Sequence, residues 1–363
     1  MDYLVKKNII KKNKIIVDIG QKFVKILAVS YEKGRISIHN THKFDVSSCF
    51  FEGELSDVKE LVKKIYEALN RKKLWKSTEI SLSLPSYMVI HKIVSVKNVK
   101  PKDLDKHIKK DFPTLGKANA VTHYIDWAYL GQREENGETV HYCMLAAVSK
   151  AYIMPILQEF EKRKLKVTTI SFPAYNLVSF SDLYANDYEH QNKLLLDFGA
   201  SSTRVVVECE GVAVYAREID IGFNTFVDSL FNSFLSVGIP EIIAMFTEMG
   251  HDRENFMAGL HDKEAFFAIV DKLVGDLQNE LIRIIQMCDE DGFSVTKIIC
   301  CSSIIEGMLK LFEENGITVD AFFNLQSSQN INGSTYTVIL DNTVSEIDST
   351  FNSAVGLAVS TLQ

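Results

Sequence analysis

A strand, a tight polar turn and a second strand occur twice in this chain, and the two copies share one pattern. The first copy is "IIVDIGQKFVKILAV", residues 15–29, and the second is "LLLDFGASSTRVVVE", residues 194–208. In each copy an Asp, Asp18 or Asp197, ends the apolar run, and a Gly follows two residues later. This repetition indicates a duplicated fold unit rather than a short-period repeat.

The residues that follow the first turn predict a β-β-β-α-β order. Strands are expected at 15–19, 23–30 and 35–39, and the amphipathic stretch 56–74 predicts a helix for which Ser56 is the candidate N-cap. The alternating segment 79–84 predicts the next strand, which Pro85 ends. A second three-strand meander begins near residue 191. Two such units facing each other would leave a cleft between their first hairpins.

The length of 363 residues is compatible with two domains. We expect a first domain at 1–190, with a small α+β insert at about 86–165 made of strands around a short lysine-rich helix. We expect a second domain at 191–363, with a helical subdomain at about 223–290. The predicted fold class is therefore α/β.

Composition places the chain among ordinary globular proteins and excludes several classes. Hydrophobic residues make up 46% of the chain and charged residues 24%, and the net charge is −7. The six cysteines are scattered without a C-x-x-C pair, which argues against a metal site and for free thiols in a reducing compartment. Because neither a signal peptide nor a membrane-spanning run is found, the expected location is cytoplasmic. A negative net charge without a basic-aromatic pattern argues against nucleic acid.

The repeated turn has a physical use in holding a phosphate chain. Glycine lets the backbone come close to a ligand, and successive N–H groups form an anion-binding concavity. An Asp at the strand end can hold a hydrated Mg²⁺, so Asp18 and Asp197 are candidate metal residues. The other candidate phosphate residues are Gly20, Gln21 and Lys22 in the first turn and Gly199, Ala200, Ser201, Ser202 and Thr203 in the second.

Other nucleotide and catalytic motifs do not occur in the sequence. G-x-x-x-x-G-K-[ST], G-x-G-x-x-G and G-x-S-x-G are all missing. "DFG" at residues 197–199 occurs in protein kinases, but a glycine-rich loop and a catalytic-loop motif do not accompany it. Either turn alone could simply connect two strands, so the phosphate-binding hypothesis rests on the occurrence of both.

The two turns and the segments around them resemble the superfamily of actin, Hsp70 and the sugar kinases. Within it the chain resembles the actin-like PilM family of type IV pilus assembly, with FtsA as the nearest relative. The similarity covers almost the whole chain and rests on "VDIGQKFVKILAV", "FFEGELSDVKELVKKIYEAL", "SLSLPSYMVIHKIVSV", "DFP", "LLLDFGASSTRVVVECEGVAVYAREIDIGFNTF", "NELIRII" and "FNSAVGLAVS". It implies a duplicated actin-like ATPase fold, with two RNase H-like β-β-β-α-β domains around a cleft.

The resemblance also implies a site for ATP and Mg²⁺ in the cleft. Glu280 and Arg283 fall on the helix that the family places near the ribose. The adenosine turn of the family is rich in glycine, whereas Ser302 and Ser303 stand there in this chain. A glycine-rich turn can adopt a positive φ, which is costly for residues with a side chain. The two serines therefore leave undecided whether ATP binds. A residue that would position the attacking water does not stand out, so at most weak ATPase activity is expected.

The resemblance implies a scaffold that works through partners. The expected partner is the N-terminal tail of an inner-membrane PilN-like protein, docked in the first domain and its insert, with the pilus motor ATPase or platform protein as a further partner. Membrane contact is expected through partners only. FtsA carries a longer tail that ends in an amphipathic membrane helix, and nothing like it follows "GLAVS" here. An FtsA-like filament protein of cell division and a small-molecule kinase of the same superfamily stay open as alternatives.

Overall fold

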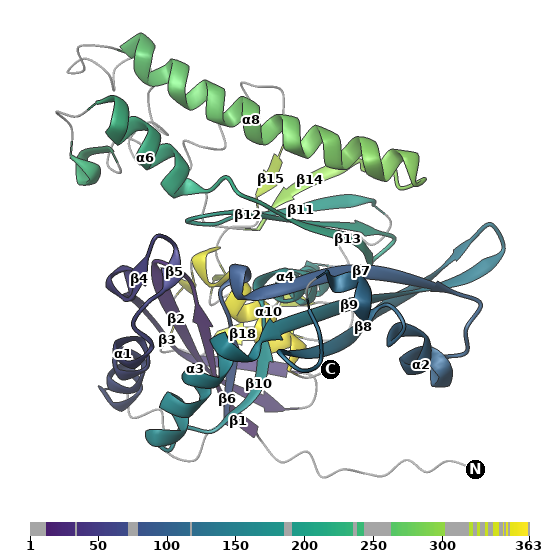
Figure 1. The fold of residues 1–363 in the computed structure, drawn as a ribbon, viewed down its shortest axis with the longest axis horizontal. Coiled ribbons are helices and arrows are strands. Elements are labelled where there is room, and N and C mark those ends of the chain that lie inside the picture. The colour runs from purple at the N-terminus through teal and green to yellow at the C-terminus, as the bar shows by residue number, and fades with distance from the viewer. Residues whose placement is uncertain are drawn as a thin grey trace. The chain divides into compact units, whose positions relative to one another are not determined.

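The structure is a computed structural model in which most of the chain can be described (Figure 1). The described residues are 12–32, 35–71, 79–116, 118–184, 191–234, 238–242, 263–301, 319–321, 325–326, 331–332, 337–340, 344, 346–347 and 349–361. Contacts divide the chain into two compact units, and each is described by itself. The first unit comprises 1–89, 149–188 and 324–363, and the second comprises 90–148 and 189–323.

The first unit is built on a mixed sheet with the strand order β10-β6-β1-β2-β3-β18-β17. β2 runs antiparallel to β1 and β3, whereas β6 lies parallel to β1, and β10 parallel to β6. The strands of this sheet are β1 (Lys12–Ile19), β2 (Phe23–Glu32), β3 (Arg35–Asp45), β6 (Glu79–Ser83), β10 (Val167–Ser171), β17 (Ile331–Asn332) and β18 (Thr337–Leu340). Two short ribbons accompany it: β4 (Phe50–Phe51) with β5 (Glu54–Leu55), and β16 (Leu325–Gln326) with β19 (Glu346–Ile347).

Helices cover both faces of this sheet (Figure 1). α1 (Val58–Arg71) packs against α3 (Lys150–Lys162), while α10 (Asn352–Ser360) packs on β1, β2 and β6 and against α4 (Pro173–Ser181). The apolar positions of α1 recur at helical spacing and are buried, as the sequence predicts. The predicted cap is wrong by one residue, because Asp57 Oδ1 accepts from Glu60 N at 2.9 Å while Ser56 Oγ donates to Cys49 O at 3.0 Å.

The second unit repeats the arrangement of the first. Its sheet has the order β13-β12-β11-β14-β15, with β11 and β12 antiparallel and β11 and β14 parallel. The strands are β11 (Lys193–Phe198), β12 (Thr203–Cys209), β13 (Val212–Ile219), β14 (Lys297–Cys300) and β15 (Val319–Ala321). α6 (Phe223–Ser233) and the long α8 (Lys263–Glu290) bury their apolar sides against this sheet.

The order β15-β14-β11-β12-β13 matches β10-β6-β1-β2-β3 strand for strand and direction for direction. In both sets of five matched strands the middle strand carries the Asp of the turn motif, and its antiparallel neighbour follows the turn. The duplicated α/β unit predicted from the sequence is therefore confirmed.

The predicted α+β insert is present as a small subdomain. Its sheet has the order β7-β9-β8, and its strands are β7 (Val89–Lys97), β8 (His123–Glu135) and β9 (Glu138–Ser149). The β8–β9 turn is Asn136-Gly137, both at positive φ, as a two-residue hairpin requires. α2 (Leu104–Ile108) packs on one face of the sheet.

The insert packs within the second unit through β8 and β13. A Cβ on Gly131 would lie 2.9 Å from Val212 Cγ2, so this glycine permits a close approach. Arg133 Nε also lies 3.3 Å from Glu210 Oε2. One boundary between the two units lies at residues 188 and 189, near the predicted residue 190, but the contacts group the insert with the second unit and residues 324–363 with the first. The division into domains at 1–190 and 191–363 stays a prediction.

Candidate functional site

In the first turn the carboxylate of Asp18 is buried and already has polar partners. Lys25 is the residue opposite Asp18 in the β1–β2 register, and its Nζ lies 3.1 Å from Asp18 Oδ2. Ser353 Oγ, at the start of α10, donates to Asp18 Oδ1 at 3.3 Å. The charge of this candidate metal residue is therefore balanced by a lysine ammonium within the same hairpin.

The backbone of the first turn is tight around Gly20. Gly20 N donates to Phe23 O at 3.0 Å, and a Cβ at Gly20 would lie 2.9 Å from that oxygen. Gln21 Nε2 donates to Gly53 O at 2.7 Å, which ties the turn to the β4–β5 ribbon. Lys22 Nζ lies 5.6 Å from the centroid of the half-buried Phe23 ring. Gln21 and Lys22 therefore have intramolecular contacts where the resemblance implies phosphate.

In the second turn Asp197 repeats the environment of Asp18. Arg204 stands opposite Asp197 in the β11–β12 register, and its Nε donates to Asp197 Oδ2 at 2.7 Å. Gly199 N donates to Ser202 O at 2.9 Å. A Cβ at Gly199 would lie 2.6 Å from Arg204 Nη2, so only glycine leaves room for the guanidinium beside this turn.

The second turn is joined to the start of α6 by backbone hydrogen bonds. Phe223 N donates to Gly199 O at 3.0 Å, and Asn224 N donates to Ala200 O at 2.7 Å. Gly222, the N-cap of α6, lies so close that a Cβ there would be 2.5 Å from Ser202 N. Two of the orphan N–H groups at this helix start are therefore satisfied by carbonyls of the turn.

The hydroxyls of the second turn are mostly engaged, whereas three of its backbone N–H groups have no acceptor among the described residues. Ser202 Oγ donates to a carboxylate oxygen of Glu218, and Thr203 Oγ1 donates to Ile221 O at 2.6 Å. Among the described residues, the backbone N–H groups of 200–202 have no hydrogen-bond acceptor. Three neighbouring donors beside a guanidinium form an anion-binding arrangement.

The two turns therefore share more than the sequence motif indicates. In both, the Asp pairs with the basic residue seven positions later, and the Gly N–H donates to the carbonyl three positions later. The sequence analysis missed Lys25 and Arg204. A six-residue link in an antiparallel hairpin places these positions opposite each other, so the register could have identified them.

This arrangement fits an anion better than a metal ion. Each turn supplies one carboxylate, and a cation already lies against it, so less charge is left for Mg²⁺. Among the described residues, no group of three or more His, Cys, Asp or Glu side chains could hold a metal ion. The residues that could hold phosphate are the amides of 200–202 together with Ser201 and Arg204.

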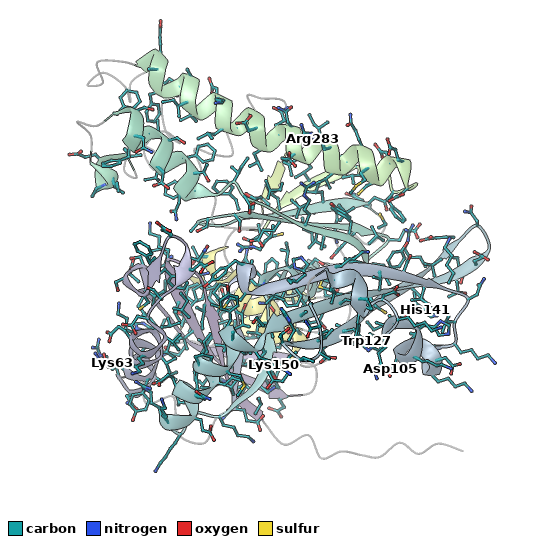
Figure 2. The ribbon with its side chains drawn as sticks, in the orientation of Figure 1. Lys63, Asp105, Trp127, His141, Lys150 and Arg283 are labelled. Carbon is teal, nitrogen blue, oxygen red and sulfur yellow. The ribbon has the colours of Figure 1, made fainter. Side chains whose placement is uncertain are left out.

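The candidate ribose residues pair with each other on α8. Arg283 Nη1 donates to Glu280 Oε1 at 2.5 Å, and Arg217 Nη2 of β13 lies 3.2 Å from Glu280 Oε2. Figure 2 shows the Arg283 side chain on the outer part of α8. Ser302 and Ser303 lie outside the described residues, so the adenosine turn stays a prediction.

Within the described part of the chain, no helix is both long enough and apolar enough to cross a bilayer. The longest helix, α8, alternates buried apolar and exposed charged positions along its length.

Comparison with known proteins identifies a family and a fold. The profile of the family described as type IV pilus assembly protein PilM matches residues 16–238. Among solved structures, a "PilM-PilN type IV pilus biogenesis complex" chain is 15% identical, with a TM-score of 0.74 over 96% of this chain and 98% of that one. The ethanolamine utilization protein EutJ from Carboxydothermus hydrogenoformans is 11% identical, with a TM-score of 0.52 over 96% and 89%. A sequence search of curated proteins finds no match.

These likenesses confirm the predicted actin-like fold. Both solved structures align with nearly the full length of this chain, so the likeness includes the insert and both turn-bearing sheets.

Proposed function

The chain belongs to the type IV pilus assembly protein PilM family, and from that premise we propose that it is a cytoplasmic, actin-like scaffold of pilus assembly. It would hold an inner-membrane protein on one surface and connect it to the motor ATPase or platform protein of the pilus machine. The observation that carries the proposal is the family match over residues 16–238, which include the first turn, the insert and the second turn.

The partner of the scaffold is the N-terminal tail of a PilN-like protein. The solved structure with a TM-score of 0.74 is named as a complex of PilM with PilN, which supports a partner of this kind. A short peptide recruits a soluble domain by laying apolar side chains against an exposed apolar surface. The tail therefore needs exposed apolar side chains in the first unit or the insert.

The N-terminal half of α3 offers such a side chain. Tyr152 is 42% exposed, although its ring is apolar enough to be buried. Tyr152 is held edge-on against Tyr87, with ring centroids 6.3 Å apart, and Tyr87 Oη in turn accepts from Leu55 N at 2.7 Å. An aromatic ring fixed in this way loses little conformational freedom when a peptide binds. We therefore propose that the tail docks on α3.

A titration with the synthetic tail of the PilN-like protein from the same genome tests this docking. The full chain should bind it saturably, and the variant Tyr152→Ala should bind at least tenfold more weakly. Phe231→Ala on α6 is the matched control, because Phe231 is similarly exposed at 37% in the other unit. If the wild-type chain does not bind, tail docking is wrong. If Tyr152→Ala binds like wild type, the tail docks elsewhere.

We further propose that the second hairpin binds the phosphates of ATP. The backbone N–H groups of 200–202, which have no acceptor among the described residues, would donate to phosphate oxygens, and Arg204 would supply positive charge. Because Asp197 is already paired, Mg²⁺ would arrive with the nucleotide rather than bind to the turn first. The nucleotide then acts as a ligand that biases the conformation on which partners dock.

Calorimetric titration with ATP, with and without Mg²⁺, tests the nucleotide proposal. Saturable binding that is lost in Arg204→Gln and kept in Arg71→Gln would support it, since Arg71 is an exposed arginine on α1. Equal binding by wild type and Arg204→Gln would place the nucleotide elsewhere. A folded wild type that does not bind ATP would leave the scaffold function without a nucleotide.

A further inference from the structure

The insert carries a positive charge that is opposite in sign to that of the chain. Residues 90–122 contain eight lysines and three aspartates, and neither arginine nor glutamate, for a net charge of +5. The whole chain has a net charge of −7. The positive field is therefore concentrated in one short segment, where it acts locally on charged partners.

The fold turns these lysines to the surface on one side of the insert. Leu104 and Ile108 are buried, and Ile108 packs into the apolar cluster that also contains Cys143 and Leu145 of β9. Residues two positions away lie on the opposite side of a helical segment. The exposed lysines on the outer side of this helical segment are accordingly Lys102, Lys106, Lys109 and Lys110.

Asp105, a carboxylate of the same helical segment, is already engaged. Asp105 Oδ2 accepts from Lys109 Nζ at 2.6 Å, and Asp105 Oδ1 accepts from Trp127 Nε1 at 3.1 Å. Figure 2 shows Asp105 and Trp127 together beside α2. In the described part of the chain, Lys102, Lys106 and Lys110 have no carboxylate within salt-bridge distance. Their charges are therefore free to attract an external anion.

Exposed apolar side chains lie in the same subdomain. Val121 is 83% exposed in the turn that leads into β8, and Tyr124 is 50% exposed at the start of that strand. Asn119 Oδ1 accepts from the backbone N–H groups of Val121 and Thr122, both at 3.1 Å, which fixes the turn. Exposed lysines and an exposed valine in one subdomain have the composition of surfaces that rest on a lipid headgroup layer.

We propose that this basic side of the insert, formed by Lys102, Lys106, Lys109 and Lys110 together with Val121, contacts an anionic lipid bilayer directly. The lysines attract acidic headgroups without selecting a particular one, while Val121 enters the interfacial region. The lack of arginine argues against nucleic acid, since base and phosphate recognition relies on its bidentate fork. The contact gives the chain a membrane attachment of its own, in addition to any attachment through a protein partner.

Co-sedimentation of the full chain with vesicles tests the proposal. Vesicles of phosphatidylcholine with about 30 to 40% phosphatidylglycerol are compared with vesicles of pure phosphatidylcholine. Each is measured at about 0.1 M salt and again at about 0.5 M salt, where charges are screened more strongly. The variant is Lys102→Gln/Lys106→Gln/Lys110→Gln. The control, Lys59→Gln/Lys63→Gln/Arg71→Gln, removes the same charge from exposed positions on α1. Circular dichroism checks that both variants fold.

The expected result is salt-sensitive binding to the anionic vesicles only. Each lysine near the surface raises the partition coefficient about fivefold. The partition coefficient of the insert variant should therefore fall on the order of a hundredfold, and that of the control much less. Val121→Ser should weaken binding without changing its salt dependence. Equal losses in both triple variants, or no binding to anionic vesicles, would overturn the proposal. Binding to a polyglutamate peptide but not to the vesicles would overturn it as well and identify an acidic protein as the occupant.

Discussion

Arg204 Nε lies 2.7 Å from Asp197 Oδ2, and the two residues are direct cross-strand partners on β11 and β12. Their side chains are only 17% and 14% exposed, so each charge depends largely on the other for its stabilisation. The pair closes the hairpin just beside the turn whose backbone N–H groups have no acceptor among the described residues. It therefore fixes the shape of the candidate anion site whether or not a ligand is present.

Removing one member of this pair should destabilise the fold. Arg204→Ala leaves the Asp197 carboxylate with little solvent and no guanidinium, which costs about 1–3 kcal/mol in free energy of unfolding. Asp197→Asn/Arg204→Ala should recover part of that loss, because it leaves no isolated charge. Urea denaturation of the single and double variants measures both values.

A surface ion pair provides the control for this prediction. Lys166 Nζ lies 3.1 Å from Glu79 Oε1, but the two side chains are 72% and 46% exposed. Lys166→Ala should cost less than about 1 kcal/mol. If Lys166→Ala and Arg204→Ala cost the same, the Asp197–Arg204 pair does not stabilise the hairpin beyond an ordinary surface contact.

Much of this architecture could be predicted from the sequence, because strand periodicity and the repeated turn are local signals. The strands β1, β2, β11 and β12 lie where the apolar runs predict them. The cap of α1 was missed because Ser56 and Asp57 are adjacent and both can cap, and only the helix register decides between them.

Contacts between residues far apart in the chain could not be predicted in the same way. The packing of Gly131 against Val212 joins positions about 80 residues apart, and a hydrophobic pattern does not encode such a contact. Lys25 and Arg204 were missed for a different reason: a basic residue on a strand is ordinary in sequence, and only the hairpin register gives it a carboxylate partner.

Two helical glycines should respond in opposite ways to alanine. A Cβ on Gly356 of α10 would lie 2.0 Å from Asn176 O of α4, so Gly356→Ala must force the two helices apart. The expected loss is about 3 kcal/mol or more in free energy of unfolding. Gly275 of α8 has no atom within 4 Å of the added carbon, so Gly275→Ala should gain about 0.5–1 kcal/mol.

Thermal unfolding of these two variants side by side gives the comparison. Both substitutions add the same methyl group in a helix interior, so their helix propensities cancel. If Gly356→Ala were as stable as Gly275→Ala, the close approach of α4 and α10 would be wrong.

The thiols should be unreactive in the folded protein. All six cysteines are buried. Burial raises the pKa of Cys143 to about 12 and that of Cys288 to about 11, and it holds the pKa of Cys301 well above the ordinary value. Because the thiolate is the reactive form, Ellman's reagent at about pH 8 should label almost nothing until denaturant is added, and then six thiols per chain. Rapid labelling of one thiol in the native chain would contradict this burial.

Glu159 should make stability depend on pH in the acid range. Lys162 Nζ and Arg163 Nη1 donate to its two carboxylate oxygens at 2.5 and 2.6 Å, and these hydrogen bonds lower the pKa of Glu159 in the folded state. A lowered pKa stabilises the fold above the unfolded value of about 4.3, and the contribution disappears as the pH falls through the folded pKa. Between about pH 5 and 3, the unfolding free energy should therefore fall more steeply for wild type than for Glu159→Gln. Parallel urea titrations at several pH values measure the difference, and identical slopes would mean that this carboxylate is not linked to folding.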